Sequence, residues 1–193
     1  MKRSALFLCV SVLLLTSCQQ SATNERIDQY EGKSVINLDG KKILIEGVGE
    51  SGTTIFIVVR HAEKQSNENP GLNILGADRA NRLASILEDF PLKAIYSTYT
   101  NRTRETAGPC AKMKDLEIIN YSAEHQEKLF QGIAKRGKGE AYLIVGHSNT
   151  IPQLLNLFKG KAVYENIDEN VFDNLFVVIV KNSGQAEILE LKY

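Results

Sequence analysis

The sequence predicts an α/β protein, built as a three-layer α/β/α sandwich around a mostly parallel central sheet. Apolar runs such as residues 54–59 and 141–146 are continuous and rich in β-branched residues, which is typical of strands buried on both faces. They alternate with segments such as 74–90, whose apolar residues recur at helical spacing. Alternating strands and helices favour a parallel sheet with helices on both faces.

Residues 53–193 form the predicted domain. Helix-breaking and helix-capping residues predict where its helices begin and end. Pro91 ends the first helix, Thr98 or Thr100 is a candidate N-cap of the second, and Ser122 is a candidate N-cap of the third. We expect helices over 74–90, 101–113, 123–136 and 150–158, and strands over 54–59, 93–97, 116–121, 141–146, 174–180 and 186–193.

Residues 35–52 precede this domain and predict an accessory β-hairpin at its edge. The pair Asp39-Gly40 separates two apolar runs, and such a pair is a strong signal for a tight hairpin turn.

Residues 1–17 have the pattern of a signal peptide. A basic head, Lys2 and Arg3, precedes an apolar run too short to span a bilayer comfortably, and the run ends in Leu-Thr-Ser before Cys18. This order resembles a bacterial lipobox, in which the cysteine becomes lipidated, and residues 18–34 would then form a flexible tether. We therefore expect a lipid-anchored protein on the periplasmic or extracellular face of a bacterial cell envelope. A plain secretory signal and an uncleaved anchor are the alternatives.

Charge and cysteine content narrow the class of protein further. The 23 basic residues equal the 23 acidic residues, so nothing in the net charge indicates a nucleic-acid partner. Once the predicted signal peptide is removed together with Cys9, and Cys18 is lipidated, Cys110 is left without a disulfide partner. We interpret Cys110 as a small buried apolar residue and not as a nucleophile.

Polar side chains follow three of the predicted strands at the point where each strand ends. Arg60 and His61 end the first, Arg102 follows the second, and His147 and Ser148 follow the fourth. Ligands of open α/β sheets bind beyond the carboxyl ends of the strands, so these groups are predicted to share one pocket.

Two imidazoles and two guanidinium groups suit a phosphoryl group. Arginine forks bind its oxygens in pairs, and a neutral, oriented imidazole can attack phosphorus once the negative charge is balanced. Because cationic side chains supply this charge, the reaction is expected to need neither a metal nor another cofactor.

Three segments together resemble the histidine phosphatase superfamily, also called phosphoglycerate mutase-like, in its small bacterial branch. Residues 60–64 (RHAEK) match the Arg-His-Gly signature with Ala62 in place of glycine. Residues 102–107 (RTRETA) match the Arg-Thr-x-x-Thr-Ala helix start, and residues 146–148 match Gly-His-Ser. The resemblance covers residues 53–193 and implies a phosphoglycerate mutase-like fold.

The resemblance also implies a role for each matched residue. His61 would be the nucleophile that becomes phosphorylated, while Arg60, Arg102 and His147 would hold the phosphoryl oxygens. Two further residues, Ser148 and Asn67, are candidates for hydrogen bonds to the phosphate.

These residues also have simpler interpretations: His61 as a core histidine bonded to the backbone, His147 as a helix-capping residue, and Arg102 as a surface arginine. Arg104 would then replace Arg102, and Glu63 with Lys64 is interpreted as a surface ion pair. Gly-His-Ser-Asn-Thr resembles the Gly-x-Ser-x-Gly elbow of serine hydrolases, but Thr150 stands where that turn needs glycine. A zinc site is disfavoured because the paired-ligand spacing is absent.

The general acid is the least defined part of the predicted site. Glu124 is the candidate because it is the first carboxylate after the third strand, with Glu127 and Asp173 as rivals. A site without a dedicated acid is the alternative, and it would favour substrates with good leaving groups.

The sequence thus predicts a metal-independent phosphatase that hydrolyses a small phosphate monoester through a phosphohistidine on His61, tethered to the membrane through lipid on Cys18. The alternatives are a non-catalytic lipoprotein that binds phosphate or sugar phosphate on the same scaffold, and a phosphotransferase of the phosphoglycerate mutase type.

Overall fold

The structure is a computed structural model that describes residues 33–193. The predicted signal peptide 1–17, Cys18 and the tether up to residue 32 lie outside the described residues. The strands are β1 (Lys33–Leu38), β2 (Lys41–Glu46), β3 (Thr53–Arg60), β4 (Leu92–Ser97), β5 (Ile118–Asn120), β6 (Ala141–Gly146), β7 (Asn174–Lys181) and β8 (Ala186–Lys192). The helices are α2 (Ile74–Ile86), α3 (Asn101–Lys114), the 3₁₀ turn η1 (Ala123–His125), α4 (Gln126–Ala134) and α5 (Thr150–Lys159).

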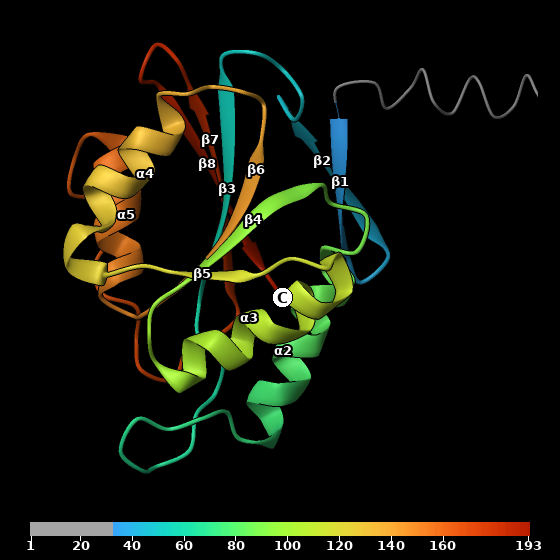
Figure 1. Cartoon of the computed structure of the whole chain (residues 1–193), viewed down its shortest axis with the longest axis vertical. Coiled ribbons are helices and arrows are strands. Elements are labelled where there is room, and N and C mark those ends of the chain that lie inside the picture. The colour runs from blue at the N-terminus through green and yellow to red at the C-terminus, as the bar shows by residue number, and fades with distance from the viewer. Residues whose placement is uncertain (1–32) are drawn as a thin grey trace, which may run out of the picture. The chain divides into compact units, whose positions relative to one another are not determined.

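The central sheet has the strand order β5-β4-β6-β3-β7-β8 (Figure 1). β3, β6, β4 and β5 are parallel to one another, whereas β7 runs antiparallel to both β3 and β8. The predicted α/β fold with a mostly parallel sheet is therefore confirmed.

Strand β3 shows why the sheet must be covered on both sides. Its residues are buried throughout, and successive side chains enter opposite layers. Ile55 and Ile57 belong to one apolar cluster, while Phe56 and Val58 belong to the other. A strand without a polar face fits only in the middle of a sandwich.

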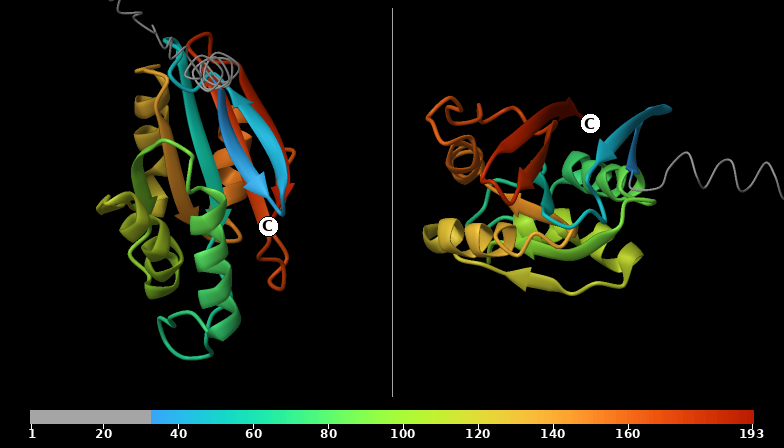
Figure 2. Two further views of the ribbon diagram at one scale, coloured as in Figure 1. Left: turned by 90° about the vertical axis from the view of Figure 1, so that its right-hand side faces the viewer. Right: turned by 90° about the horizontal axis from the view of Figure 1, so that it is seen from above.

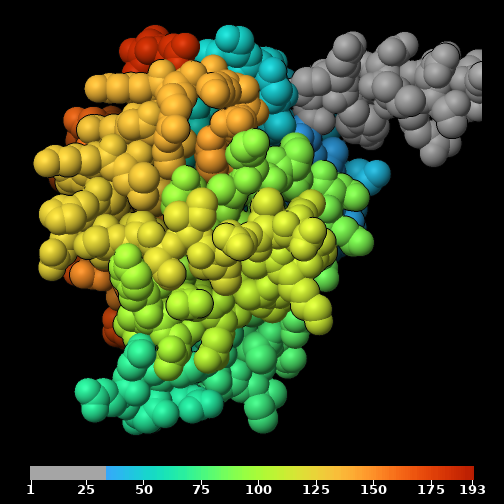
Figure 3. Space-filling model, in the orientation of Figure 1, coloured from blue at the N-terminus to red at the C-terminus, as the bar shows by residue number. Residues whose placement is uncertain are grey.

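Helices supply the two outer layers. Buried residues of α2 and α3, such as Leu83 and Ala107, pack into the first cluster, and those of α4 and α5, such as Phe130 and Leu154, pack into the second. Figure 1 shows the two pairs on opposite sides of the sheet, and Figure 3 shows α3 and the β5-to-α4 segment, in green and yellow, at the centre of one face. No helix within residues 33–193 is long and apolar enough to cross a membrane.

Strands β1 and β2 form a separate two-stranded antiparallel ribbon (Figure 2). Asp39 and Gly40 make its turn with φ of 50° and 81°, a conformation that the Asp-Gly pair tolerates. Ile36 and Ile45 are buried against the α2 side of the core. Pairing begins at Lys33, so the ribbon takes in the last two residues that the sequence assigned to the tether.

Two helix limits differ from those expected. α2 ends at Ile86 and the chain continues in turns to Phe90, the residue whose helical conformation Pro91 disfavours. The helix expected over 123–136 opens with η1 instead, a common way for an α-helix to begin. Neither Thr100 nor Ser122 makes a side-chain cap hydrogen bond.

Candidate active site

The candidate site lies where β3, β6 and β4 end side by side. Arg60 pairs with Gly146 and Ser97 with Val145, so the carboxyl ends of the three strands are level. The backbone N–H of His61 donates to the Gly146 carbonyl over 2.9 Å, which extends the pairing one residue beyond the strand. Residues that follow each strand therefore meet at one edge.

An open pocket of about 380 Å³ occupies this edge. The lining includes all four residues expected to bind or attack the phosphoryl group, together with Ser148. The lining residues are Arg60, His61, Lys64, Arg102, Ala123, His147, Ser148, Asn149, Thr150 and Glu169.

His61 is buried and held in one orientation. Its Nδ1 lies 2.8 Å from the carbonyl oxygen of Ala62. A carbonyl only accepts, so Nδ1 carries the proton and Nε2 keeps its lone pair. Burial, together with the charges of Arg60, Arg102 and His147, lowers the pKa of His61 to about 4. The imidazole is thus neutral near neutral pH.

The loop that carries His61 is fastened to α3 by one hydroxyl group. Thr106 Oγ1 accepts from the Ala62 N–H over 2.9 Å and donates to the Arg102 carbonyl over 2.7 Å. Ala62 and Thr106 are fully buried. Thr106 of the helix motif therefore positions the loop that carries His61.

His147 is positioned from both ring nitrogens, and its ring centroid lies 5.5 Å from that of His61. Arg102 Nη2 lies 3.3 Å from Nδ1, and Thr98 Oγ1 lies 2.8 Å from Nε2. Because a guanidinium group only donates, Nδ1 accepts and the Nε2–H donates to Thr98. Burial, followed by the charges of Arg102 and Arg60, lowers the pKa of His147 to about 4.

Arg102 reaches the pocket from the first turn of α3. Its Nε is buried without a hydrogen-bond partner within residues 33–193, which leaves a donor to spare beside the two imidazoles. Arg104 is exposed and does not line the pocket. The structure therefore places Arg102, and not its alternative Arg104, among the phosphate-binding candidates.

Arg60 is almost completely buried, with 1% of its side chain exposed. Its Nη1 donates to the carbonyls of Asp168 and Val171 over 2.7 and 3.0 Å, and its guanidinium carbon lies 4.4 Å from the centre of the Phe172 ring. Nη2 donates to Glu169 over 3.0 Å. Residues 168–172, between α5 and β7, thus cover this arginine.

The carboxylates expected as candidate acids lie elsewhere. Glu124 and Glu127 are exposed and do not line the pocket, although Ala123, next to Glu124, does. Asp173 forms an ion pair with Lys192 at 2.7 Å. Glu169 is the carboxylate that lines the pocket, and hydrogen bonding from Ser148 together with the charge of Arg60 lowers its pKa.

The expected Glu63–Lys64 ion pair is absent from residues 33–193, and Asn67 lies outside the pocket. Glu63 and Lys64 do not pair with each other: Glu63 forms a two-pronged ion pair with Arg79, while Lys64 lines the pocket. The expected surface pair was wrong because Arg79, one turn into α2, faces Glu63. Asn67 is exposed in the loop between β3 and α2 and does not line the pocket.

Cys110 is fully buried in α3, and burial raises the pKa of its thiol to about 11. Such a thiol is a poor nucleophile, as the sequence indicated.

Three residues with a place in the site were not found from the sequence as site residues. Thr98 and Thr106 carry hydroxyl groups that orient His147 and the His61 loop. Thr106 stands inside the matched helix motif, which is the signal that would have found it. Glu169 lies in a loop without periodicity or motif, so no signal distinguished it from the other carboxylates there.

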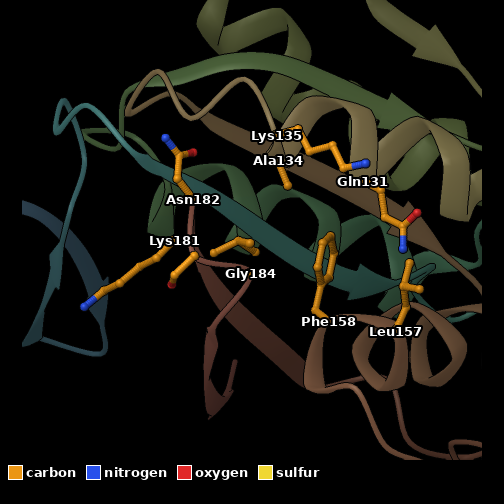
Figure 4. Close-up of a pocket in the computed structure, with 10 residues that line it drawn as sticks. Gln131, Ala134, Lys135, Leu157, Phe158, Lys181, Asn182 and Gly184 are labelled. Atoms are coloured by element: carbon orange, nitrogen blue, oxygen red, sulfur yellow. The ribbon is translucent and has the colours of Figure 1, made fainter.

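A second pocket of about 310 Å³ lies at the opposite edge of the sheet (Figure 4). It is formed by the ends of α4 and α5 and by the β7–β8 turn, with Phe158 and Leu157 on one side and Gly184 on the other. Its lining contains no histidine or arginine, so the predicted chemistry belongs to the first pocket.

Two imidazoles and two guanidinium groups at the carboxyl edge of an α/β sheet are groups that can bind a phosphoryl group. In the comparison with known proteins, residues 56–123 match the model of the histidine phosphatase superfamily (branch 1). The matched span contains two of the three motifs, residues 60–64 and 102–107, and so supports the resemblance that they indicated. No curated protein sequence matches the chain at a significant level.

Solved structures share the fold at low sequence identity. The protein histidine phosphatase SixA complexed with tungstate aligns with a TM-score of 0.59 at 12% identity, over 72% of this chain and 96% of that one. A phosphoserine phosphatase from Entamoeba histolytica aligns with a TM-score of 0.58 at 14% identity, over 72% of this chain and 97% of that one. A phosphoglycerate mutase from Plasmodium falciparum aligns with a TM-score of 0.54 at 18% identity, over 72% of this chain and 90% of that one. These likenesses establish a phosphoglycerate mutase-like fold.

Proposed function

We propose that the protein is a metal-independent phosphatase that hydrolyses phosphate monoesters through a phosphohistidine on His61. The family match and the phosphatases among the structural neighbours support this class of activity. The observation that carries the proposal is the fixed ring of His61. Its Nδ1–H is bound to the Ala62 carbonyl, so Nε2 is the free nucleophilic atom, and a pKa of about 4 keeps it unprotonated.

The proposed reaction has two displacements at phosphorus. His61 Nε2 forms a bond to phosphorus while the bond from phosphorus to the ester oxygen breaks, and the leaving oxygen takes a proton from water. Arg60 and Arg102 stabilise the charge on the equatorial oxygens, and His147 joins them when its Nε2–H exchanges Thr98 for a phosphoryl oxygen. Water then attacks the phosphohistidine, releases inorganic phosphate and restores the neutral imidazole.

The lining of the pocket favours substrates with good leaving groups. Glu169 is its sole carboxylate, and a lowered pKa keeps that group ionised, so it is a poor proton donor. Aryl phosphates, acyl phosphates and phosphohistidine need less help from an acid than alkyl phosphates do.

The test is hydrolysis of a panel of phosphate esters with EDTA present, by the wild type and by two histidine variants. His61→Ala removes the proposed nucleophile, whereas His125→Ala removes an exposed imidazole outside the pocket and serves as the matched control. We expect turnover by the wild type and the control and none by His61→Ala. Phosphate binding without turnover of any ester by the wild type would instead identify a binding protein.

We further propose that the protein is lipid-anchored through Cys18 to a bacterial cell envelope. The support is the order of basic head, apolar run, small residues and cysteine in residues 1–18. In a bacterial host fed labelled palmitate, the wild type should become labelled and sediment with membranes, and Cys18→Ser should do neither. Membrane attachment of Cys18→Ser without label would indicate an uncleaved anchor.

A further inference from the structure

Glu169 bridges two residues of the pocket. Its Oε2 accepts from Arg60 Nη2 over 3.0 Å, and its Oε1 accepts from Ser148 Oγ over 3.0 Å. The two ends of this contact differ sharply, because the Glu169 side chain is 74% exposed and that of Arg60 is 1% exposed. The carboxylate therefore contacts a buried cation from the solvent side.

Nη2 is the amine of Arg60 that meets Glu169, and the Nε–H is buried without a hydrogen-bond partner within residues 33–193. Nη1 is engaged by the carbonyls of Asp168 and Val171, and Phe172 lies against the guanidinium group. A phosphoryl oxygen that approaches Arg60 Nη2 from the pocket lies next to the Glu169 carboxylate and competes with it for this amine. Both are anions, so they cannot share that site without repulsion.

From this competition we propose that Glu169 is a specificity-determining residue. It acts as an internal competitor for the phosphoryl position on Arg60 and, once displaced, remains beside the leaving group through its bond to Ser148. There it selects phosphate esters whose leaving group is neutral or cationic and acts against anionic ones. The selection among esters rests on the proposed phosphatase function, whereas the competition for Arg60 does not.

The mouth of the pocket carries one exposed charge of each sign, so Glu169 and Lys64 act on a charged leaving group in opposite senses. Glu169 is the single acidic residue of the lining, and Lys64 is the exposed cation of that lining. Replacing Glu169 by glutamine removes the negative charge and keeps the shape. Glu165 lies in the same α5–β7 segment, is exposed and does not line the pocket, so Glu165→Gln is the matched control.

The first experiment measures binding of inorganic phosphate to the full chain by calorimetry, which needs no turnover. We expect Glu169→Gln to bind phosphate about tenfold more tightly than the wild type and Glu165→Gln to match the wild type. Glu169→Asp keeps the charge and should stay close to the wild type. Unchanged or weaker binding by Glu169→Gln would overturn the proposal, since weaker binding would mean that Glu169 only holds Arg60 in place.

The second experiment compares two aryl esters that differ in the charge of the leaving group, tyramine phosphate and the phosphate ester of para-hydroxyphenylacetate. The wild type should prefer the tyramine ester, and Glu169→Gln should shift the ratio of kcat/KM toward the anionic ester by roughly tenfold. A ratio unchanged by Glu169→Gln would refute the selection while leaving the phosphatase intact. Tighter phosphate binding by Glu169→Gln with no turnover by the wild type would support the competition and refute the phosphatase.

Discussion

The buried imidazole of His61 and the partly buried imidazole of His147 should make the stability of the protein depend steeply on pH. His61 and His147 have their pKa lowered from 6.5 to about 4 in the folded chain, so between these values the unfolded chain binds more protons than the folded one. Stability therefore falls as the pH drops through this window. The cost of holding the imidazoles uncharged is absent well above pH 6.5 and complete below about pH 4.

The size of the effect follows from the same two values. Between about pH 7 and about pH 5.5, each imidazole lowers the free energy of unfolding by about 1.2 kcal/mol, which gives roughly 2.5 kcal/mol for the two together. This interval lies above the range in which ordinary carboxylates titrate, so the histidines dominate it.

Urea unfolding of the full chain at the two pH values, in buffer free of phosphate, measures this difference. The variant His61→Asn with His147→Asn should lose most of the pH dependence, and the exposed control His125→Asn should keep it. A wild type equally stable at both pH values, or a double variant with an undiminished dependence, would refute the assignment of the two imidazoles as neutral groups.

Three further predictions concern the neighbours of the histidines. Arg102→Lys should lower kcat/KM about a hundredfold, because an ammonium group lacks the planar fork, while leaving thermal unfolding near that of the wild type; an equal kcat/KM would remove Arg102 from the phosphoryl site. Thr106→Val should cost about 1–3 kcal/mol in urea unfolding by leaving the buried Ala62 N–H without an acceptor, whereas Thr106→Ser should restore most of it. Glu124→Gln should affect para-nitrophenyl phosphate and an alkyl phosphate equally, since Glu124 does not line the pocket; a larger loss on the alkyl ester would identify it as the acid.

The parts of the site that the sequence predicts correctly follow from strand ends. Arg60, His61 and His147 stand directly after continuous apolar runs, and parallel strands bring such positions to one edge whatever the loops do. Arg102 follows a neighbouring strand by a short distance and is fixed by the first turn of α3. These four residues were therefore accessible from local sequence and a general rule of α/β topology.

The parts that the sequence leaves open depend on loops and on long-range contacts. One segment without periodicity holds four acidic residues: Glu165, Asp168, Glu169 and Asp173. Only the path of the chain brings the carboxylate of Glu169 onto Arg60. Thr98 is suitable as a helix cap by its type and position, yet its hydroxyl group bonds to a histidine 49 positions away. Contacts of this kind have no local signature.

The central claim is that His61 itself carries the phosphoryl group during the reaction. Its most direct test is rapid mixing of the full chain with para-nitrophenyl phosphate, an alkaline quench that preserves phosphohistidine, and peptide mass spectrometry. The account predicts that one phosphoryl group appears on the peptide containing His61 during steady turnover. An enzyme that turns over while the group is found on His147 or Ser148, or on no residue, would contradict it.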